Sequence, residues 1–300
     1  MKRIPLILLT LCFVAGFLSA AAEPPKPDFI KWIDFKASKE MIQKAYNADI
    51  NLRELGIMDI GTCEILAWVA LKNGNRFSTS RDTANLNKLL KELRGGNRTE
   101  IDKYAGNKYF KYYKESYHAV LDGIIGEYSE NGVKKYGLRG YFPLAAGHWY
   151  SDYDDFGNSR GYGFKRRHLG HDIFGSTGTP IIAVEGGTVT EWGWNQYGGW
   201  RIGIRSDDTK RYYYYAHLRR NTPYPEGVQL GSRVSAGQVI GYLGVTGYSR
   251  KANTNMKTTK PHLHFGMQII FDPSQEDGNG EIWIDVYQIC KFLAERRVKV

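Results

Sequence analysis

Two histidines, His262 and His264, stand on either side of one leucine in the segment PHLHFGMQI. Histidine is scarce in this chain, with seven among 300 residues. Successive side chains of a β-strand point to opposite faces, so a strand here would direct both imidazoles to the same face. Imidazole binds metals and moves protons near neutral pH. The pair therefore marks a candidate site for metal binding or acid–base chemistry.

A second candidate segment is KRRHLGHDIFGSTGTP, in which His168 and Asp172 are four residues apart. This spacing lets both side chains reach one ion from a helix or a tight loop. With a further nitrogen from His264 or His262, they would form a zinc site whose fourth position is open to water, as in catalytic zinc centres. Imidazole and carboxylate donors suit zinc better than magnesium or calcium, which prefer all-oxygen shells. His171 competes with His168 as a ligand because it stands beside Asp172.

The elements that must position these residues are short strands. The second half of the chain is rich in glycine and aromatic residues, and its alternating runs are separated by turn residues. The strand candidates are TPIIAVEGGTVTEWGW, WRIGIRS, KRYYYYAHL, GQVIGYLG and HLHFGMQII, with SDDTK as a hairpin connection. No helical pattern of useful length interrupts them, so we expect an antiparallel sheet.

The first half, from about residue 28 to 130, has helical periodicity instead. Helices are predicted over SKEMIQKAYNADINLREL, over DTANLNKLLKELRGG with Asp82 as a candidate cap and Gly95-Gly96 as the stop, and over TEIDKYAGNKYFKYYKESYHAVLDGIIGEY. The final stretch WIDVYQICKFLAERRVKV predicts one more. Four tyrosines of the third segment share one helical face and could grip sugar rings, but packing inside a helical domain is favoured; they are Tyr109, Tyr112, Tyr113 and Tyr117.

The chain begins with a short basic start and an apolar run, MKRIPLILLTLCFVAGFLSAAAEPP. This pattern predicts a secretory signal cleaved after Ala21 or Ala22, with an uncleaved membrane anchor as the alternative. Because of this signal we expect the protein to act outside the cytoplasm, and no later segment has the length and apolarity of a membrane helix. Cys12 would leave with the signal. Cys63 and Cys290 would remain, and these two could form one disulfide but not a cysteine-rich scaffold.

The net charge of +10 and the isoelectric point near 9.3 favour an anionic partner surface. An exported protein meets cell-wall polymers and lipid headgroups before nucleic acid. Because the basic residues are scattered rather than concentrated in one arm, a generally solvated basic surface is the favoured interpretation. We predict no nucleic-acid partner, and the composition leaves the oligomeric state open.

Five ordered motifs, HLGHD, GTPIIAVEGGTV, YYYAHL, GQVIGYLGVTG and PHLHFGM, carry a resemblance to a known family. Over roughly residues 143 to 272 the chain resembles the lysostaphin-like, LytM-type zinc metallopeptidases. The resemblance implies that His168, Asp172 and His264 are zinc ligands. It further implies that His262 and His217 are catalytic and not ligands. Zinc-assisted hydrolysis of a peptide bond is the implied chemistry.

Some residues stay outside this pattern or depart from it. Tyr162, six residues before His168, could reach the developing oxyanion. His118 and His148 match no motif and are predicted to be structural. The stretch GVTGYSRKANTNMKTTKPHLHF inserts a polar, basic loop before the histidine pair, and Gly266 replaces the family's usual glutamate. Neither change removes a ligand, and we expect the inserted loop to border the groove.

The sequence therefore predicts an α+β protein of four parts. A signal peptide covers residues 1–22, a helical domain of unknown role 23–138, a zinc metallopeptidase domain 139–275, and a helical tail 276–300. The predicted function is a secreted zinc endopeptidase that hydrolyses peptide cross-links of bacterial peptidoglycan. A non-enzymatic LytM-type regulator or scaffold of the cell envelope is the alternative. The membrane would be a partner only if the signal stayed uncleaved.

Overall fold

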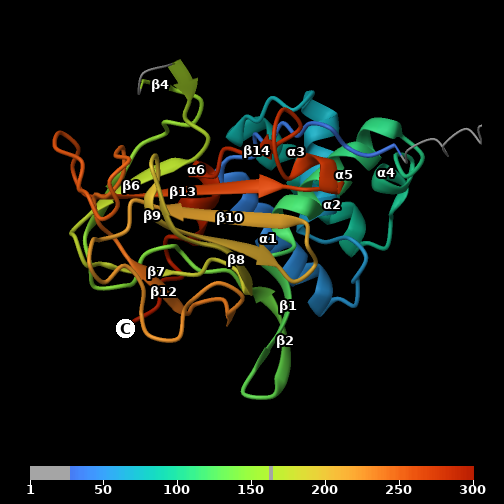
Figure 1. Cartoon of the computed structure of the whole chain (residues 1–300). Coiled ribbons are helices and arrows are strands. Elements are labelled where there is room, and N and C mark those ends of the chain that lie inside the picture. Colours follow the sequence, from blue (N-terminus) through green and yellow to red (C-terminus); the bar gives the residue numbers. More distant parts are fainter. Residues whose placement is uncertain (1–27, 162–164) are drawn as a thin grey trace, which may run out of the picture.

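The computed structural model describes residues 28–161 and 165–300, and the chain folds as an α+β protein, as predicted (Figure 1). The predicted signal peptide and Tyr162 lie outside the described residues. Six α-helices are present in the described part: α1 Lys39–Glu54, α2 Thr62–Asn73, α3 Thr79–Arg94, α4 Thr99–Asp102, α5 Lys108–Leu121 and α6 Tyr287–Leu293. None of the described helices combines the length and apolarity needed to cross a membrane.

Helix α3 ends at Arg94, directly before the predicted glycine stop, but it begins earlier than predicted. Ser78 holds the N-cap position, whereas Asp82 lies inside the first turn and is buried. The Asp82 carboxylate accepts a hydrogen bond from the Ser78 backbone N–H at 2.6 Å. Asp82 therefore satisfies a free N–H of the helix start from within the first turn, rather than from the cap itself.

The single long helix predicted over residues 99–128 is wrong. Helix α4 already ends at Asp102. Asn107 begins the next helix, because its side chain accepts hydrogen bonds from the Tyr109 and Phe110 N–H groups in the first turn of α5. After α5 the chain forms the hairpin β1 Ile125–Glu130 and β2 Val133–Leu138. The tyrosine stripe is divided: Tyr117 is completely buried in the core, as the packing interpretation requires, whereas Tyr109 is 56% exposed.

The C-terminal helix is also shorter than predicted. Only Tyr287–Leu293 is helical, and the preceding Ile282–Trp283 is strand β14, which pairs with the end of β13. Beyond α6 the backbone N–H groups of Phe142 and Ala146 donate to the carbonyls of Arg296 and Val298. The tail is extended there because its carbonyl groups are engaged by a distant segment instead of by a helix.

The main sheet has eight strands, and every pairing recorded within it is antiparallel, as predicted. The strands follow the order β11-β8-β9-β10-β13-β6-β3, and β14 pairs with β13. Their bounds are β3 Tyr150–Asp152, β6 His171–Gly175, β8 Gly187–Asn195, β9 Gly199–Ser206, β10 Arg211–Ala216, β11 Arg233–Val234 and β13 His262–Ile269. Separate small pairs are β4 Ser159–Gly161 with β5 Lys165–Arg167, and β7 Pro180–Ile182 with β12 Val239–Tyr242.

Alternation along β10 and β13 gives the sheet one core face and one open face. The core face carries Tyr213, Tyr215, Leu263 and Phe265, all at most 1% exposed. The intervening residues lie on the other face, so His262 and His264 share it. One strand thus contributes both to the core and to the candidate site.

One hydrophobic core contains residues of the helices and of the sheet, including Leu66 and Tyr117 from the helices and Phe265 from the sheet. A buried polar contact joins the two halves: the Arg211 guanidinium, 1% exposed, donates 2.9 Å to the carbonyl oxygen of Ala119 in α5. Figure 1 shows helices α2 to α5 gathered at the end of the sheet where β10 begins and β13 ends. The site residues of these strands therefore lie at the opposite end. Cys63 and Cys290 are both buried and unpaired with each other.

Candidate metal centre and active site

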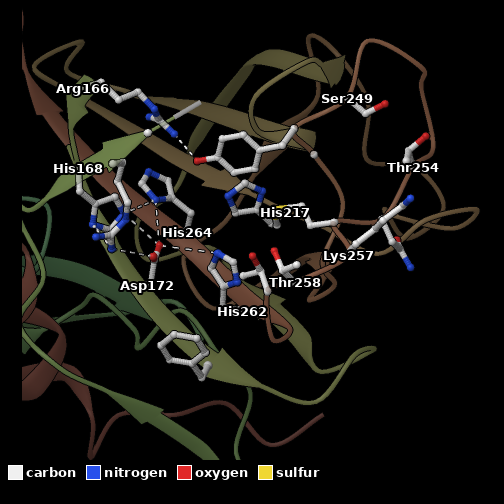
Figure 2. A pocket seen from close by; sticks show the side chains of 18 residues that line it. Arg166, His168, Asp172, His217, Ser249, Thr254, Lys257, Thr258, His262 and His264 are labelled. Carbon is white, nitrogen blue, oxygen red and sulfur yellow. Dashed lines mark hydrogen bonds and ion pairs between the residues drawn. The ribbon is translucent and has the colours of Figure 1, made fainter. Parts of the chain in front are cut away.

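Three predicted ligands from two segments come together at one end of the sheet (Figure 2). His168 Nε2 lies 3.0 Å from Asp172 Oδ1 and 2.8 Å from His264 Nδ1. His264 Nδ1 lies 3.1 Å from the same Asp172 oxygen. The antiparallel register of β6 and β13 causes the convergence, because it sets Asp172 directly opposite His264.

The donor atoms fit a zinc ion. Two nitrogens and one carboxylate oxygen match a catalytic zinc site, in which a tetrahedral ion with Zn–N bonds of 2.0–2.1 Å separates its ligands by about 3.3 Å. The three spacings here are 2.8–3.1 Å. Gly170 makes room for the set, since a Cβ at that position would lie 2.6 Å from two ring atoms of His264.

His171, the competing candidate, is placed elsewhere. It directly precedes Asp172 in β6, so its side chain points to the opposite face of the sheet, and its Nε2 lies 3.0 Å from Asp152 Oδ2. His171 is 1% exposed and packs edge-on against Tyr287. It is therefore a buried, ion-paired residue, and it does not join the three converging donor atoms.

The sequence analysis missed Asp155 and Arg160, which contact two of the three predicted metal ligands. Asp155, 1% exposed, lies with Oδ2 3.1 Å from His168 Nδ1, the ring nitrogen that faces away from Asp172. Arg160 donates to Asp155 Oδ2 at 2.6 Å and to Asp172 Oδ2 at 3.3 Å. A carboxylate on the second nitrogen of a histidine ligand orients the ring and raises its basicity. The sequence signal was the aspartate cluster at 152–155 in a basic chain.

His217 and His262 face the same pocket, and their tautomers follow from their partners. A backbone carbonyl only accepts, so His217 donates Nδ1–H to Thr246 O and His262 donates Nδ1–H to Lys260 O, both at 2.8 Å. In the neutral form of each ring, Nε2 then carries no proton. The two rings are 4.7 Å apart, and His262 Nε2 lies 3.9 Å from Asp172 Oδ1. This geometry presents two proton acceptors beside the donor cluster.

His217 is held in an uncommon backbone conformation, with φ at +63°. Residues other than glycine rarely occupy this left-handed region, and such strain persists at functional sites where the surrounding structure enforces it. Here the His217 N–H donates to Gly198 O at 2.8 Å, and a Cβ on Gly247 would come within 3.0 Å of Nδ1. Close packing therefore fixes this ring.

Burial and charge set the protonation of the site. Burial lowers the pKa of His217 well below 6.5, and the neighbouring His262 and His264 lower it further, so His217 is neutral at pH 7. Burial alone would raise the pKa of Asp172, but hydrogen bonds from His168 and His264 outweigh it and lower the pKa. Burial would likewise raise the pKa of Asp155, yet bonds from His168 and His171 lower it to about 2. Two ionised carboxylates thus favour a cation at this position.

These side chains line a pocket of about 600 Å³. One wall is the inserted loop before the histidine pair, from Tyr248 and Ser249 to the stretch 254–259. The loop thus borders the pocket, as predicted, and Tyr248 stacks against His217 at 5.9 Å. No residue of the described helical half is among the lining residues, so that half does not cover the pocket.

The model of peptidase family M23 matches residues 166–277, a range that includes all five predicted site residues. Residues 166–277 are therefore a peptidase family M23 domain. Among the relatives, the chain is 40% identical over 149 residues to the L-Ala–D-Glu endopeptidase of Bacillus subtilis, covering 48% of this chain and 44% of that protein. It is 40% identical over 99 residues to lysostaphin of Staphylococcus simulans, covering 33% of this chain and 17% of lysostaphin.

A solved structure also resembles this chain over most of its length. The lytM protein of Ruminococcus gnavus aligns with a TM-score of 0.56 and 25% identity over 87% of each chain. The likeness extends through the helical half as well as the sheet. By contrast, the chain covers less than half the length of the two relatives above.

Proposed function

We propose that this protein is a zinc-dependent endopeptidase that hydrolyses peptide cross-links of bacterial peptidoglycan. The observation that supports it is the meeting, in one pocket, of three ligand atoms and two imidazoles whose Nδ1 atoms contact backbone carbonyls. The family and the endopeptidase names of two relatives agree with this chemistry. Residues 139–275 would form the catalytic domain, and the protein would act in the cell envelope after export.

In this proposal His168, Asp172 and His264 hold the ion. A zinc ion held there would supply Lewis acidity that polarises the scissile carbonyl and lowers the pKa of the attacking water. Asp155 keeps the His168 ring oriented through Nδ1, and Arg160 holds both carboxylates in place. Three protein ligands leave a position open, which distinguishes a catalytic site from a closed structural one.

His217 and His262 would move the protons. Neutral His217 can accept a proton at Nε2 because its Nδ1 already donates to a backbone carbonyl. His262 offers the same atom on the side nearer Asp172. An imidazolium formed on either ring can then donate to the developing oxyanion or to the leaving amine. The pair supplies both an acceptor and a donor across the scissile bond.

The test is incubation of the purified chain with peptidoglycan, with and without a chelator, followed by mass spectrometry of the released muropeptides. We expect peptide-bond cleavage that is lost with chelator and restored by zinc. His217→Ala and His262→Ala should lose cleavage while retaining zinc, and His264→Ala should lose both. His148→Ala, an exposed histidine outside the pocket, is the matched control and should behave as the unmodified chain.

Two results would decide against this function. Full activity in His264→Ala would remove the metal from the chemistry. Zinc-loaded chain that binds peptidoglycan but releases no peptide would instead favour the alternative, a regulator or scaffold of the cell envelope. The identity of the cleaved bond, a glycyl bridge or a link involving a D-amino acid, follows from the muropeptide masses.

A further inference from the structure

A second cluster of metal-binding side chains lies in the helical half, away from the pocket described above. It consists of Cys63 at the start of α2 and of His118 and Asp122 at the end of α5. One donor atom from each lies within 4.8 Å of the other two. His118 Nδ1 and Asp122 Oδ1 are 2.8 Å apart. We propose that these three residues form a second zinc site.

The environment of His118 supports metal binding. Its other ring nitrogen, Nε2, lies 2.9 Å from Glu64 Oε1. Glu64 is itself held in place, because its Oε2 accepts from the Gly61 N–H at 3.0 Å and its Oε1 lies 3.1 Å from the Lys114 ammonium. Histidine ligands usually donate their second N–H to such a fixed carboxylate. Nδ1 is therefore the atom left to face an ion shared with Asp122 and Cys63.

The arrangement repeats that of the first centre. In both, a histidine and an aspartate are four residues apart and within hydrogen-bond distance, at 118/122 and at 168/172. In both, a distant segment brings the third donor, Cys63 here and His264 there. In both, a further carboxylate holds the second ring nitrogen, Glu64 here and Asp155 at the other centre. The two clusters share no residue.

The donor set selects the ion. A thiolate, an imidazole and a carboxylate suit zinc, whereas magnesium and calcium take oxygen ligands. Thiolate and carboxylate together carry two negative charges and neutralise a divalent ion. A pocket of about 180 Å³, lined by Cys63, His118, Asp122 and Tyr136 among others, adjoins the cluster. It provides a route for the ion and room for a fourth ligand, which water can supply.

The experiment uses the full chain, stripped by chelator, reloaded with zinc chloride, and measured for bound zinc by elemental mass spectrometry. We expect two ions per chain, one in His264→Ala, one in Cys63→Ala, and none in the double variant. Cys290→Ala removes the other buried free thiol and should keep two ions. Asp122→Asn, which alters a part-exposed side chain and preserves its shape, should lose one ion. Circular dichroism identifies variants that fail to fold.

Cobalt(II) separates the two centres, because only the second has a sulfur ligand. Thiolate-to-cobalt charge transfer in the near ultraviolet should appear in the unmodified chain and in His264→Ala, and disappear in Cys63→Ala. One zinc per unmodified chain, or a charge-transfer band that survives in Cys63→Ala, would overturn the proposal and leave the cluster as an ion-pair network. Neither result bears on peptidoglycan hydrolysis, which depends on the other centre.

Discussion

Replacing Gly170 by alanine should disable the proposed metal centre although no ligand residue is replaced. The new Cβ would lie 2.6 Å from Cε1 and Nε2 of His264 and 2.9 Å from the Phe265 carbonyl oxygen. Ordinary contact begins at 3.4 Å, so the ring must move by about 0.8 Å. The backbone carbonyl cannot yield as a flexible side chain would. Misplacing a catalytic group by about 1 Å costs on the order of 100-fold in rate, which corresponds to about 2.7 kcal/mol in the activation barrier.

The assay is kcat/KM on a soluble peptide fragment of peptidoglycan, together with zinc affinity from chelator competition. Gly161→Ala is the matched control, because Gly161 lines the same pocket and a Cβ there meets nothing within 4 Å. We expect Gly170→Ala to lose about 100-fold in kcat/KM and to bind zinc more weakly, with Gly161→Ala unchanged. If Gly170→Ala keeps both the rate and the zinc affinity of the unmodified chain, then His264 does not need its present position and the assigned ligand set is wrong.

Three further outcomes follow from the same geometry. Asp155→Asn should weaken zinc binding by about 10- to 100-fold because His168 loses its carboxylate partner. Asp152→Asn, whose side chain is 5% exposed and pairs with His171 instead, should not, and equal losses would contradict the assignment. Protonation of His217 would remove the proton acceptor and cause kcat/KM to fall at low pH. Because burial lowers the pKa of His217, this fall should occur below pH 6.5, and a fall that sets in above pH 6.5 would refute the role given to His217. Chelation should lower the melting temperature, since an ion at 1,000 times its Kd contributes about 4 kcal/mol; His264→Ala should show a smaller loss on chelation.

Local patterns were sufficient for much of the fold. Alternation predicted the antiparallel strands, and SDDTK was correctly read as a hairpin between β9 and β10. Motif order predicted that the 168–172 and 262–264 segments meet, and the β6–β13 register explains why they do. The strand predictions succeeded because the two faces of a strand alternate with every residue. The meeting of the two segments could be predicted because their motifs belong to one site.

The errors arose where tertiary contacts decide a local structure. Asn107 looks like a polar residue inside a long helix, yet its side chain caps α5 and divides the segment. Trp283 begins the predicted C-terminal helix, but it belongs to β14 and pairs with the last residues of β13. Asp155 carries no motif at all. Its importance comes from a fold that buries it against His168, which sequence spacing alone does not reveal.

The contact between Arg211 and the carbonyl of Ala119 bears on how the molecule can be shortened. The same guanidinium bonds Glu185 at 2.7 Å, and both side chains are almost wholly enclosed. Removing the helical half would remove the Ala119 carbonyl, one of the hydrogen-bond acceptors of the buried Arg211 guanidinium. Arg211 is the first residue of β10, the strand that leads to His217. A shortened chain should therefore retain α5, so that Arg211 keeps this acceptor.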